Sequence, residues 1–539
     1  MNTTLVKVVV AALISVFLYN IFLFGVQLGV GTGLLFLGLN IYFFVAREKK
    51  NENLSLAISA SAASIVFAFL FAFRDNDVVQ VVNFLAAVFF SLTALYLYKF
   101  TGSFSFQVPR FILLPILILK DFVVSLYNLA KPDTWSSSKQ IDKNITTSLF
   151  RGIAIASALF LILFFLLSQA DPIFNKLSQN FFASIRERTI TSVVIFVALT
   201  GFGLIKILEK ATETKLKNEL SVGKLHELSI ITGSISALFL VFIIVQFRYL
   251  FSAVNERDLH QLGINSLTYS EYVRKGFFEL IIVAALSSGI VIYALKFLHR
   301  FKDNQKRLIQ IFSGFLTIET GLLLLSAVKR VALYADAHGL TRARIFGFVF
   351  LLWLSVMLSI FLFRIFKETG KKNFFYISLL STLITLLFIN ILNIDGLVAT
   401  KYKPTVNNEV DYFYLTGLSS DAVDVWKEAL VESEKTLVQL ETVKSLNSED
   451  NRKLYWTRLT LDQIRFDVEY LVEKYSIQRK WQSYNLSEYL AYQKISEDAG
   501  FLEKVKDLLT RANVLESRVS DEVRFSTQLD RSVNPPLVR

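Results

Sequence analysis

Residues 345–364 read IFGFVFLLWLSVMLSIFLFR, and no charged side chain interrupts them before Arg364. A helix of about 20 apolar residues is long enough to cross the hydrocarbon core of a bilayer. Lipid offers the backbone no hydrogen-bond partners, so a spanning segment of this kind must satisfy its own N–H and C=O groups as a helix. Similar runs, separated by short charged loops, recur from Leu5 to about Asn393. The pattern predicts an all-α, polytopic transmembrane bundle.

Eleven of these runs are predicted to span the membrane. The predicted spans are residues 5–24, 27–46, 55–73, 78–98, 149–169, 188–206, 228–248, 277–296, 308–328, 345–364 and 373–393. The run at 109–130 is also apolar, but it contains two prolines and the charged pair Lys120–Asp121. Charges at mid-span are expensive, so an interfacial or re-entrant helix is predicted there, with a twelfth span as the alternative.

Composition excludes several classes of protein. The chain has 539 residues, 53% of them hydrophobic, and no cysteine, so disulfides and thiolate chemistry are excluded. Its four histidines are too scattered for a zinc motif. No phosphate-binding GxxxxGK[ST], HExxH or GxSxG motif occurs. We therefore predict no catalytic residue, metal or cofactor, and no enzymatic activity.

The net charge of +12 is unevenly distributed. From residue 394 onward, 24 acidic residues outnumber 20 basic ones, so the positive excess lies in residues 1–393. Excess Lys and Arg beside membrane helices mark cytoplasmic loops and anionic lipid rather than nucleic acid. If 109–130 does not cross, most of these basic residues fall on the side of the N-terminus. The charges predict an inner-membrane protein with a cytoplasmic N-terminus and an extracytoplasmic C-terminus.

Residues 394–530 are predicted to form a small soluble helical domain, followed by a flexible tail at 531–539. Apolar residues here follow helical spacing, and Ser419 or Ser420 is placed to cap the first helix. The predicted buried stripes are Val423, Trp426, Leu430, Leu437 and Leu440 in 420–445; Trp456, Leu459, Phe466 and Tyr470 in 450–475; and Leu502, Val505 and Leu509 in 497–518. A core of the domain's own is favoured, and binding of an envelope protein through 420–518 is the alternative.

Glu319 is the candidate buried ionisable residue, because it lies near the middle of the run at 308–328. It suits a proton carrier or ion ligand of a transporter, and equally a hydrogen-bonded residue that joins two helices. Asn20, Asn40, Asn83 and Asn390 are predicted to make interhelical hydrogen bonds.

Three loops on the predicted outer side contain a candidate polar site for an anionic or zwitterionic solute or lipid head group. Its residues are Asp171, Glu271, Arg274, Glu279, Arg330, Tyr334, Asp336, His338 and Arg342. The segment 330–344 is predicted as a hairpin between two spans. The favoured alternative is that these charges lie at the interface, snorkel and pair with each other.

Several short segments, in these loops and after the last predicted span, resemble those of a known family. They are ADPIF (170–174), RYLFSAVNE (248–256), LTYSEYVRKGFFEL (267–280), LYADAHGLTRARI (333–345), DGLVATKY (395–402) and DYFYLTGLSSDAV (411–423). The resemblance, from Ser148 to Val423, is to an uncharacterised bacterial family of polytopic inner-membrane proteins, catalogued as domains of unknown function 4173 and 4153. It implies a membrane topology and no activity.

Three functions are compatible with these sequence features. Transport or translocation of a small or lipid-like solute is favoured, because ionisable residues lie in or beside the apolar runs. An envelope scaffold or signalling protein that binds a partner through its C-terminal helices is the second. A lipid-modifying enzyme that uses the outer loops is the third and least favoured.

Overall fold

The computed structural model describes residues 3–48, 52–100, 104, 111–129, 188–202, 236, 240, 284, 287–295, 303–367, 370–406, 409–443, 446–478, 480–498 and 500–517. In this part of the chain the fold is all-α, as predicted, apart from one β-hairpin whose two strands have two residues each. The chain forms two compact units, residues 1–212 with 473–490 and residues 213–472 with 491–539. The predicted boundary at 393/394 does not follow this division and stays a prediction.

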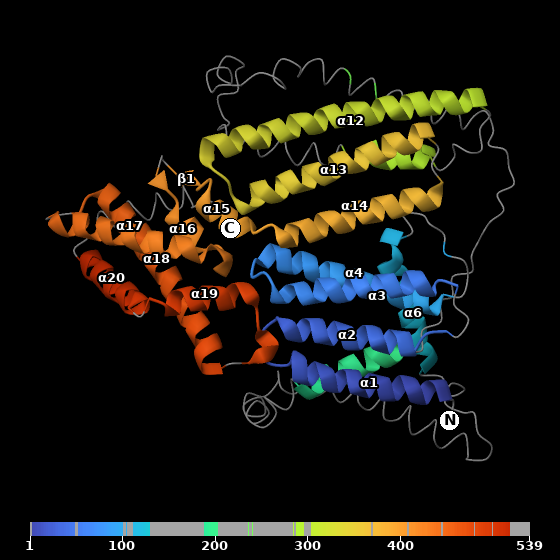
Figure 1. The fold of residues 1–539 in the computed structure, drawn as a ribbon, viewed down its shortest axis with the longest axis horizontal. Coiled ribbons are helices and arrows are strands. Elements are labelled where there is room, and N and C mark those ends of the chain that lie inside the picture. The colour runs from blue at the N-terminus through green and yellow to red at the C-terminus, as the bar shows by residue number, and fades with distance from the viewer. Residues whose placement is uncertain are drawn as a thin grey trace, which may run out of the picture. The chain divides into compact units, whose positions relative to one another are not determined.

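The first unit is built on four helices that lie side by side in sequence order (Figure 1). Its elements are α1 (Thr3–Phe22), α2 (Val30–Val45), α3 (Leu54–Phe69), the 3₁₀ turn η1 (Leu70–Ala72), α4 (Asp77–Lys99), α6 (Leu114–Leu129) and the apolar helix Arg188–Phe202. A later segment of the chain, residues 473–490, packs onto them with the π turn η5 (Glu473–Gln478), the 3₁₀ turn η6 (Trp481–Ser483) and the start of α19 (Leu486–Ser496).

The helices of the first unit bury polar side chains between them and expose apolar ones. The Asn40 side-chain nitrogen donates to the hydroxyls of Ser64 (3.3 Å) and Ser91 (3.0 Å), which are themselves 2.8 Å apart. Leu13 and Phe17 of α1, by contrast, are 55% and 64% exposed. Small and hydroxylated residues inside with apolar residues outside suit helices that associate in lipid. The predicted interhelical bonding of Asn40 is confirmed.

Two contacts place the helix Arg188–Phe202 beside α1 and α6. The Asn20 side chain accepts a hydrogen bond from Arg188 Nε and donates one to Ser192 Oγ, and both distances are 2.8 Å. At the other end of the helix, the Ser125 hydroxyl of α6 donates to the Gly201 carbonyl (2.9 Å). At about 1.5 Å per residue, α6 is about 24 Å long, less than the roughly 30 Å of a hydrocarbon core. Its interfacial or re-entrant placement stays a prediction.

The second unit contains three long helices side by side and a group of shorter ones (Figure 1). Its elements are α12 (Asp303–His338), α13 (Arg342–Lys367), α14 (Lys371–Ile391), α15 (Ile394–Thr400), β1 (Thr405–Val406), β2 (Glu409–Val410), α16 (Tyr412–Thr416), η4 (Ser420–Ala422), α17 (Val423–Thr442), α18 (Ser448–Val472), the end of α19 and α20 (Phe501–Glu516). The antiparallel strands pair Thr405 with Val410 and Val406 with Glu409.

Five of the described helices are long and apolar enough to cross a membrane. They are Leu54–Ala72, Asp77–Lys99, Lys306–Lys329, Arg342–Lys367 and Lys372–Ile391, and each coincides with a predicted span. The apolar helices Val8–Phe22, Val30–Val45 and Arg188–Phe202 coincide with three more but are shorter. Of the other predicted spans, 149–169 lies wholly, 228–248 largely and 277–296 half outside the described residues. These helices are those of a membrane protein.

The shorter helices α17, α18 and α20 pack together. The stripe predicted for α17 is confirmed, since Val423, Trp426, Leu430, Leu437 and Leu440 are all buried. The stripe predicted for α18 is wrong, because Phe466 is 65% exposed, and the buried face consists instead of Leu454, Leu461, Ile464, Val468 and Leu471. In α20, Val505 is buried as predicted, but Leu502 and Leu509 lie at the edge of the core.

Candidate functional site

Glu319 lies inside α12, within the part of the helix that is apolar enough to span. The residue is 2% exposed, and its Oε2 atom accepts a hydrogen bond of 2.6 Å from the Ser236 hydroxyl. Its Oε1 atom has no partner among the residues that the structure describes. Placing a carboxyl group in such surroundings is costly. Carboxyl groups found there usually bind an ion, carry a proton or hydrogen-bond a neighbouring helix.

The polar neighbours of Glu319 on α12 are largely satisfied by their own helix. The hydroxyl groups of Thr317 and Thr320 donate to the carbonyls of Ser313 (2.7 Å) and Leu316 (2.8 Å). The Glu319 carboxyl, in contrast, reaches a residue 83 positions away in the chain. The bond to Ser236 joins two helices, which is one role predicted for Glu319. The Oε1 atom has unused acceptor capacity, which the other predicted role, as a proton carrier or ion ligand, requires.

Arg342, at the first position of α13, is bound in a second polar cluster. Its guanidinium binds the Asp395 carboxylate in a bidentate ion pair, with N···O distances of 2.7 and 2.6 Å. The same carboxylate accepts from the Ser419 backbone N–H (3.0 Å) and from the Ser419 hydroxyl. The Arg342 backbone N–H donates to the Tyr414 hydroxyl (2.9 Å). This Arg342–Asp395 lock joins the start of α13 to the segment that follows α14.

The turn before α13 is shaped to make this lock. Gly339 has φ +74°, a conformation that favours glycine, and a Cβ atom there would overlap the Lys403 carbonyl. The Leu340 N–H donates to the Tyr402 carbonyl over 2.9 Å. The predicted hairpin at 330–344 is therefore mostly wrong, because α12 continues to His338 and only residues 339–341 form the turn.

Electrostatics favour a charged Asp395. Burial opposes ionisation of this 1%-exposed residue, but the hydrogen bonds and charge of Arg342 and the two Ser419 donors outweigh it and hold the pKa of the carboxyl below its usual range. Burial raises the pKa of Tyr414, so this phenol is neutral at physiological pH. With four donors on its two oxygens, the Asp395 carboxylate has little capacity left for a ligand. The geometry favours a structural role for the lock.

Among the described contacts of Arg342, no other residue of the predicted outer-face site occurs in the lock. Asp336 is exposed near the end of α12, whereas Arg330, Tyr334 and His338 are described only by their place in that helix. Asp171, Glu271, Arg274 and Glu279 lie outside the described residues. Within the described ranges, no three His, Cys, Asp or Glu side chains are grouped as metal ligands.

The sequence did not predict the role of residues 473–490, here called the C-terminal strap. Inside the strap, Lys474 and Glu488 form a buried ion pair of 2.5 Å, with side chains 5% and 4% exposed. The Tyr475 hydroxyl donates to the same Glu488 oxygen over 2.7 Å. A buried ion pair with a further hydrogen bond orients the side chains that carry it, and here it fixes the turn between η5 and α19.

The strap caps the ends of the first-unit helices. The Asn485 side-chain nitrogen donates to the carbonyls of Phe71 (2.8 Å) and Arg74 (3.0 Å), and the Ser487 hydroxyl donates to that of Phe73 (2.8 Å). These carbonyls have no intrahelical partner because the helix ends there. The turn between α3 and α4 thus depends on donors more than 400 residues away.

The strap also caps the start of α2. The Tyr484 carbonyl accepts from the Val30 N–H over 3.2 Å, and a Cβ atom on Gly29 would lie only 2.6 Å from that carbonyl oxygen. The Trp481 ring packs edge-on against Phe22, with ring centroids 5.8 Å apart. In the sequence of the strap, only its amide and hydroxyl side chains indicate a capping role. The signal is weak, because such side chains commonly cap helices and occur in many other places.

Comparison with known proteins identifies a family and names no activity. A family model described as a domain of unknown function (DUF4153) matches residues 61–429. No curated protein and no solved structure matches the chain. The matched region covers Glu319 and the Arg342–Asp395 lock, and the chain belongs to this family.

Proposed function

We propose that this member of the DUF4153 family is a multi-pass inner-membrane protein that transports a small or lipid-like solute, with Glu319 as its proton- or cation-binding group. The observation that carries the proposal is the buried carboxyl group inside a spanning helix, one oxygen of which has no partner among the described residues. Carboxyl groups in such positions are characteristic of ion and proton pathways.

The proposed topology has eleven spans, a cytoplasmic N-terminus and an extracytoplasmic C-terminal region. Contacts within the first unit put the strap on the same side of the membrane as the α1–α2 and α3–α4 turns. Contacts within the second unit put the α12–α13 turn on the same side as the segment after α14. No helix described between residues 394 and 490 qualifies as a span, so the proposal keeps this whole region, the strap included, on the extracytoplasmic side.

This arrangement limits the number of crossings between α4 and α12. In the proposed topology the end of α4 and the start of α12 are both cytoplasmic, so the chain between Lys99 and Asp303 would cross an even number of times. The four predicted spans at 149–169, 188–206, 228–248 and 277–296 satisfy this condition, whereas a fifth crossing at 109–130 breaks it. The count supports a non-crossing 109–130 and a total of eleven.

Reporter fusions after residues 140, 215 and 420 test the topology. A fluorescent reporter that is active only in the cytoplasm is expected to work after 140 and 215 but not after 420, and a periplasmic phosphatase reporter should give the reverse. A phosphatase signal after 140 would overturn the non-crossing assignment of 109–130.

Proteoliposomes test the transport role of Glu319. Full-length protein is reconstituted around a trapped pH dye, and proton flux is followed after addition of a defined panel of small solutes. Glu319→Gln keeps the size and hydrogen-bonding groups but not the titratable carboxyl, so we expect it to abolish the solute-dependent flux. Glu319→Asp, which keeps the carboxyl, should retain part of it.

Two outcomes would contradict this role. Wild-type vesicles as impermeable as empty ones for every solute would remove the transport proposal, and a fully active Glu319→Gln variant would remove the proton-carrier role. Insertion and helix content, measured by circular dichroism, must match the wild type for the Gln result to count.

An envelope scaffold or signalling protein is the second candidate, and exposed apolar residues on the C-terminal helices favour it. Phe466 of α18 is 65% exposed, and Val431 and Val438 of α17 are each 49% exposed. Deleting 420–539 would also remove the strap, so point changes are the sharper test. Phe466→Ser should abolish cross-linking of an envelope partner if the role is correct, and unchanged cross-linking would refute a contact through this face.

A further inference from the structure

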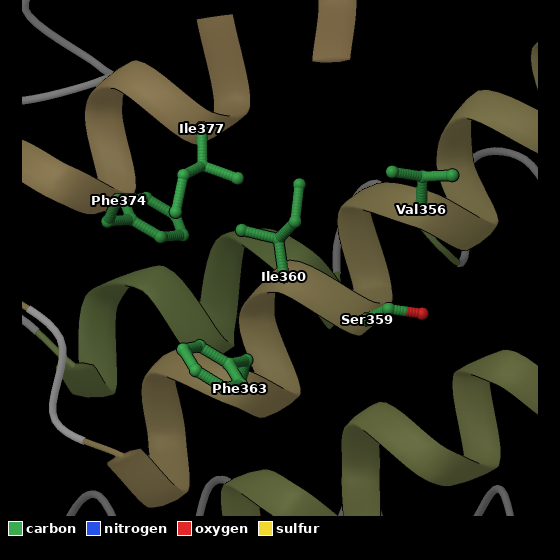
Figure 2. A pocket seen from close by; sticks show the side chains of 6 residues that line it. All are labelled: Val356, Ser359, Ile360, Phe363, Phe374 and Ile377. Carbon is green, nitrogen blue, oxygen red and sulfur yellow. The ribbon is translucent and has the colours of Figure 1, made fainter. Parts of the chain in front are cut away.

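The end of the α13–α14 hairpin that carries Arg364 combines an apolar groove with basic side chains. The groove has a volume of about 300 Å³ and lies between the later turns of α13 and the first turns of α14 (Figure 2). It is lined by Val356, Ser359, Ile360, Phe363, Phe374 and Ile377. Figure 2 shows Ile360 of one helix and Ile377 of the other directed into the space between them.

The lining is apolar and open to the surroundings of the helices. Val356, Phe363 and Ile377 are 41%, 52% and 45% exposed, and all three lie within candidate membrane spans. The Ser359 hydroxyl, the polar group of the lining, donates to the carbonyl of Ser355 in its own helix (2.9 Å). A hydrocarbon chain is therefore the chemistry that matches this groove.

Basic side chains lie at the end of the groove where the hairpin turns. The Arg364 guanidinium lies 4.1 Å from the centre of the Phe374 ring, so it is held at the groove's edge. Lys367 and Lys372 are exposed on either side of the turn. Residues 364–372 contain four basic side chains and a single acidic one, Glu368, so the turn is strongly positive.

A third helix brings further positive charge to the same end. The Gln310 side chain of α12 donates to the Ile365 carbonyl of α13 over 2.7 Å, which places the first turns of α12 beside the last turns of α13. Exposed Arg307 lies one turn before Gln310. Basic side chains from three helices thus lie at this end of the hairpin.

We propose that this hairpin end binds an anionic phospholipid, with an acyl chain in the groove and the phosphate against Arg364, Lys367 and Lys372. Charge complementarity selects the anionic head group, and the groove selects a lipid over a free phosphate. Clusters of basic residues beside membrane helices attract anionic lipids in this way. The site involves neither Glu319 nor the C-terminal strap.

Native mass spectrometry of the full-length protein tests the proposal. Detergent-purified protein is titrated with phosphatidylglycerol, with phosphatidylcholine of the same acyl chains, and with glycerol phosphate. We expect retention of phosphatidylglycerol in preference to the other two. Each charge removed by Lys367→Gln or Lys372→Gln should weaken retention roughly fivefold, the usual effect of one basic residue near an anionic surface.

Two control variants separate a site from general charge attraction. Lys435→Gln and Lys504→Gln remove exposed charges from α17 and α20 and should leave lipid retention unchanged. Ile360→Trp fills the groove without altering any charge and should reduce retention of phosphatidylglycerol. Equal retention of the two lipids, binding of glycerol phosphate alone, or an Ile360→Trp variant that retains lipid normally would each overturn the proposal.

Discussion

Replacing either partner of the Arg342–Asp395 lock should destabilise the second unit strongly. The Asp395 side chain is fully buried and that of Arg342 is 20% exposed. Breaking a buried ion pair by removing one partner typically costs about 3–5 kcal/mol, because the other charge is left without compensation. Water can reach the Arg342 guanidinium but not the Asp395 carboxylate. We therefore expect about 3 kcal/mol for Asp395→Ala and more for Arg342→Ala.

Unfolding of the purified protein in detergent, followed by tryptophan fluorescence, measures these changes. The exposed pair Lys435–Glu432, with side chains 63% and 47% exposed, is the matched control, and Glu432→Ala should cost less than about 1 kcal/mol. The double variant Arg342→Ala/Asp395→Ala should cost less than the sum of the single ones. A cost below about 1 kcal/mol for Asp395→Ala, or a strictly additive double variant, would refute the assignment of the lock.

The lock also predicts a pH dependence. The pKa of Asp395 is lower in the folded protein than its ordinary value of about 3.9, so the folded state binds fewer protons at this site. The stabilisation is therefore present above about pH 4 and is lost as the pH falls through the lowered folded value. The difference in stability between wild type and Asp395→Asn should narrow with acid, and a constant difference would contradict this reasoning.

Three further changes test the contacts that position the helices. Asn485→Ala should cost about 1–3 kcal/mol, because it removes the Asn485 donor from the buried Phe71 carbonyl and leaves the Arg74 carbonyl with the Gln80 side chain as a donor; unfolding in detergent measures it, and Ser517→Ala at the exposed end of α20 should be neutral. Gly339→Val should lower stability by at least about 1–3 kcal/mol, because a β-branched residue does not tolerate φ +74°; a wild-type melting temperature would contradict the turn geometry. Asn40→Leu should cost less than about 2 kcal/mol, the range of hydrogen bonds between membrane helices, and a larger loss would indicate a role beyond packing.

The long apolar helices were the most predictable part of the fold. The runs at 55–73, 78–98, 308–328, 345–364 and 373–393 coincide with helices that can span. Their signal is length without charge, and it does not depend on which neighbours the helix has. The α17 stripe was predictable for a similar reason, because its apolar residues occupy one face only.

The wrong predictions concern residues whose burial or hydrogen bonding is set by neighbouring helices. In α18 two helical faces carry apolar residues, one through Phe466 and one through Ile464, and the contacts with α16, α17 and α20 determine that the second is buried. Ser419 was predicted as a helix cap; it does precede η4, but its hydroxyl makes no capping hydrogen bond and instead donates to the buried Asp395 carboxylate. The lock and the strap join residues far apart in the chain, and no local pattern predicts such pairs.

The strap makes maturation of the first unit depend on the end of synthesis. Asn485 follows its acceptor Phe71 by 414 residues. At roughly 5–20 residues per second, the early hairpins wait on the order of 20–80 s after translation before their donors exist. During that interval proteases and membrane chaperones can reach two turns, the one between α1 and α2 and the one between α3 and α4. If the ribosome stalls before codon 485, these turns stay uncapped.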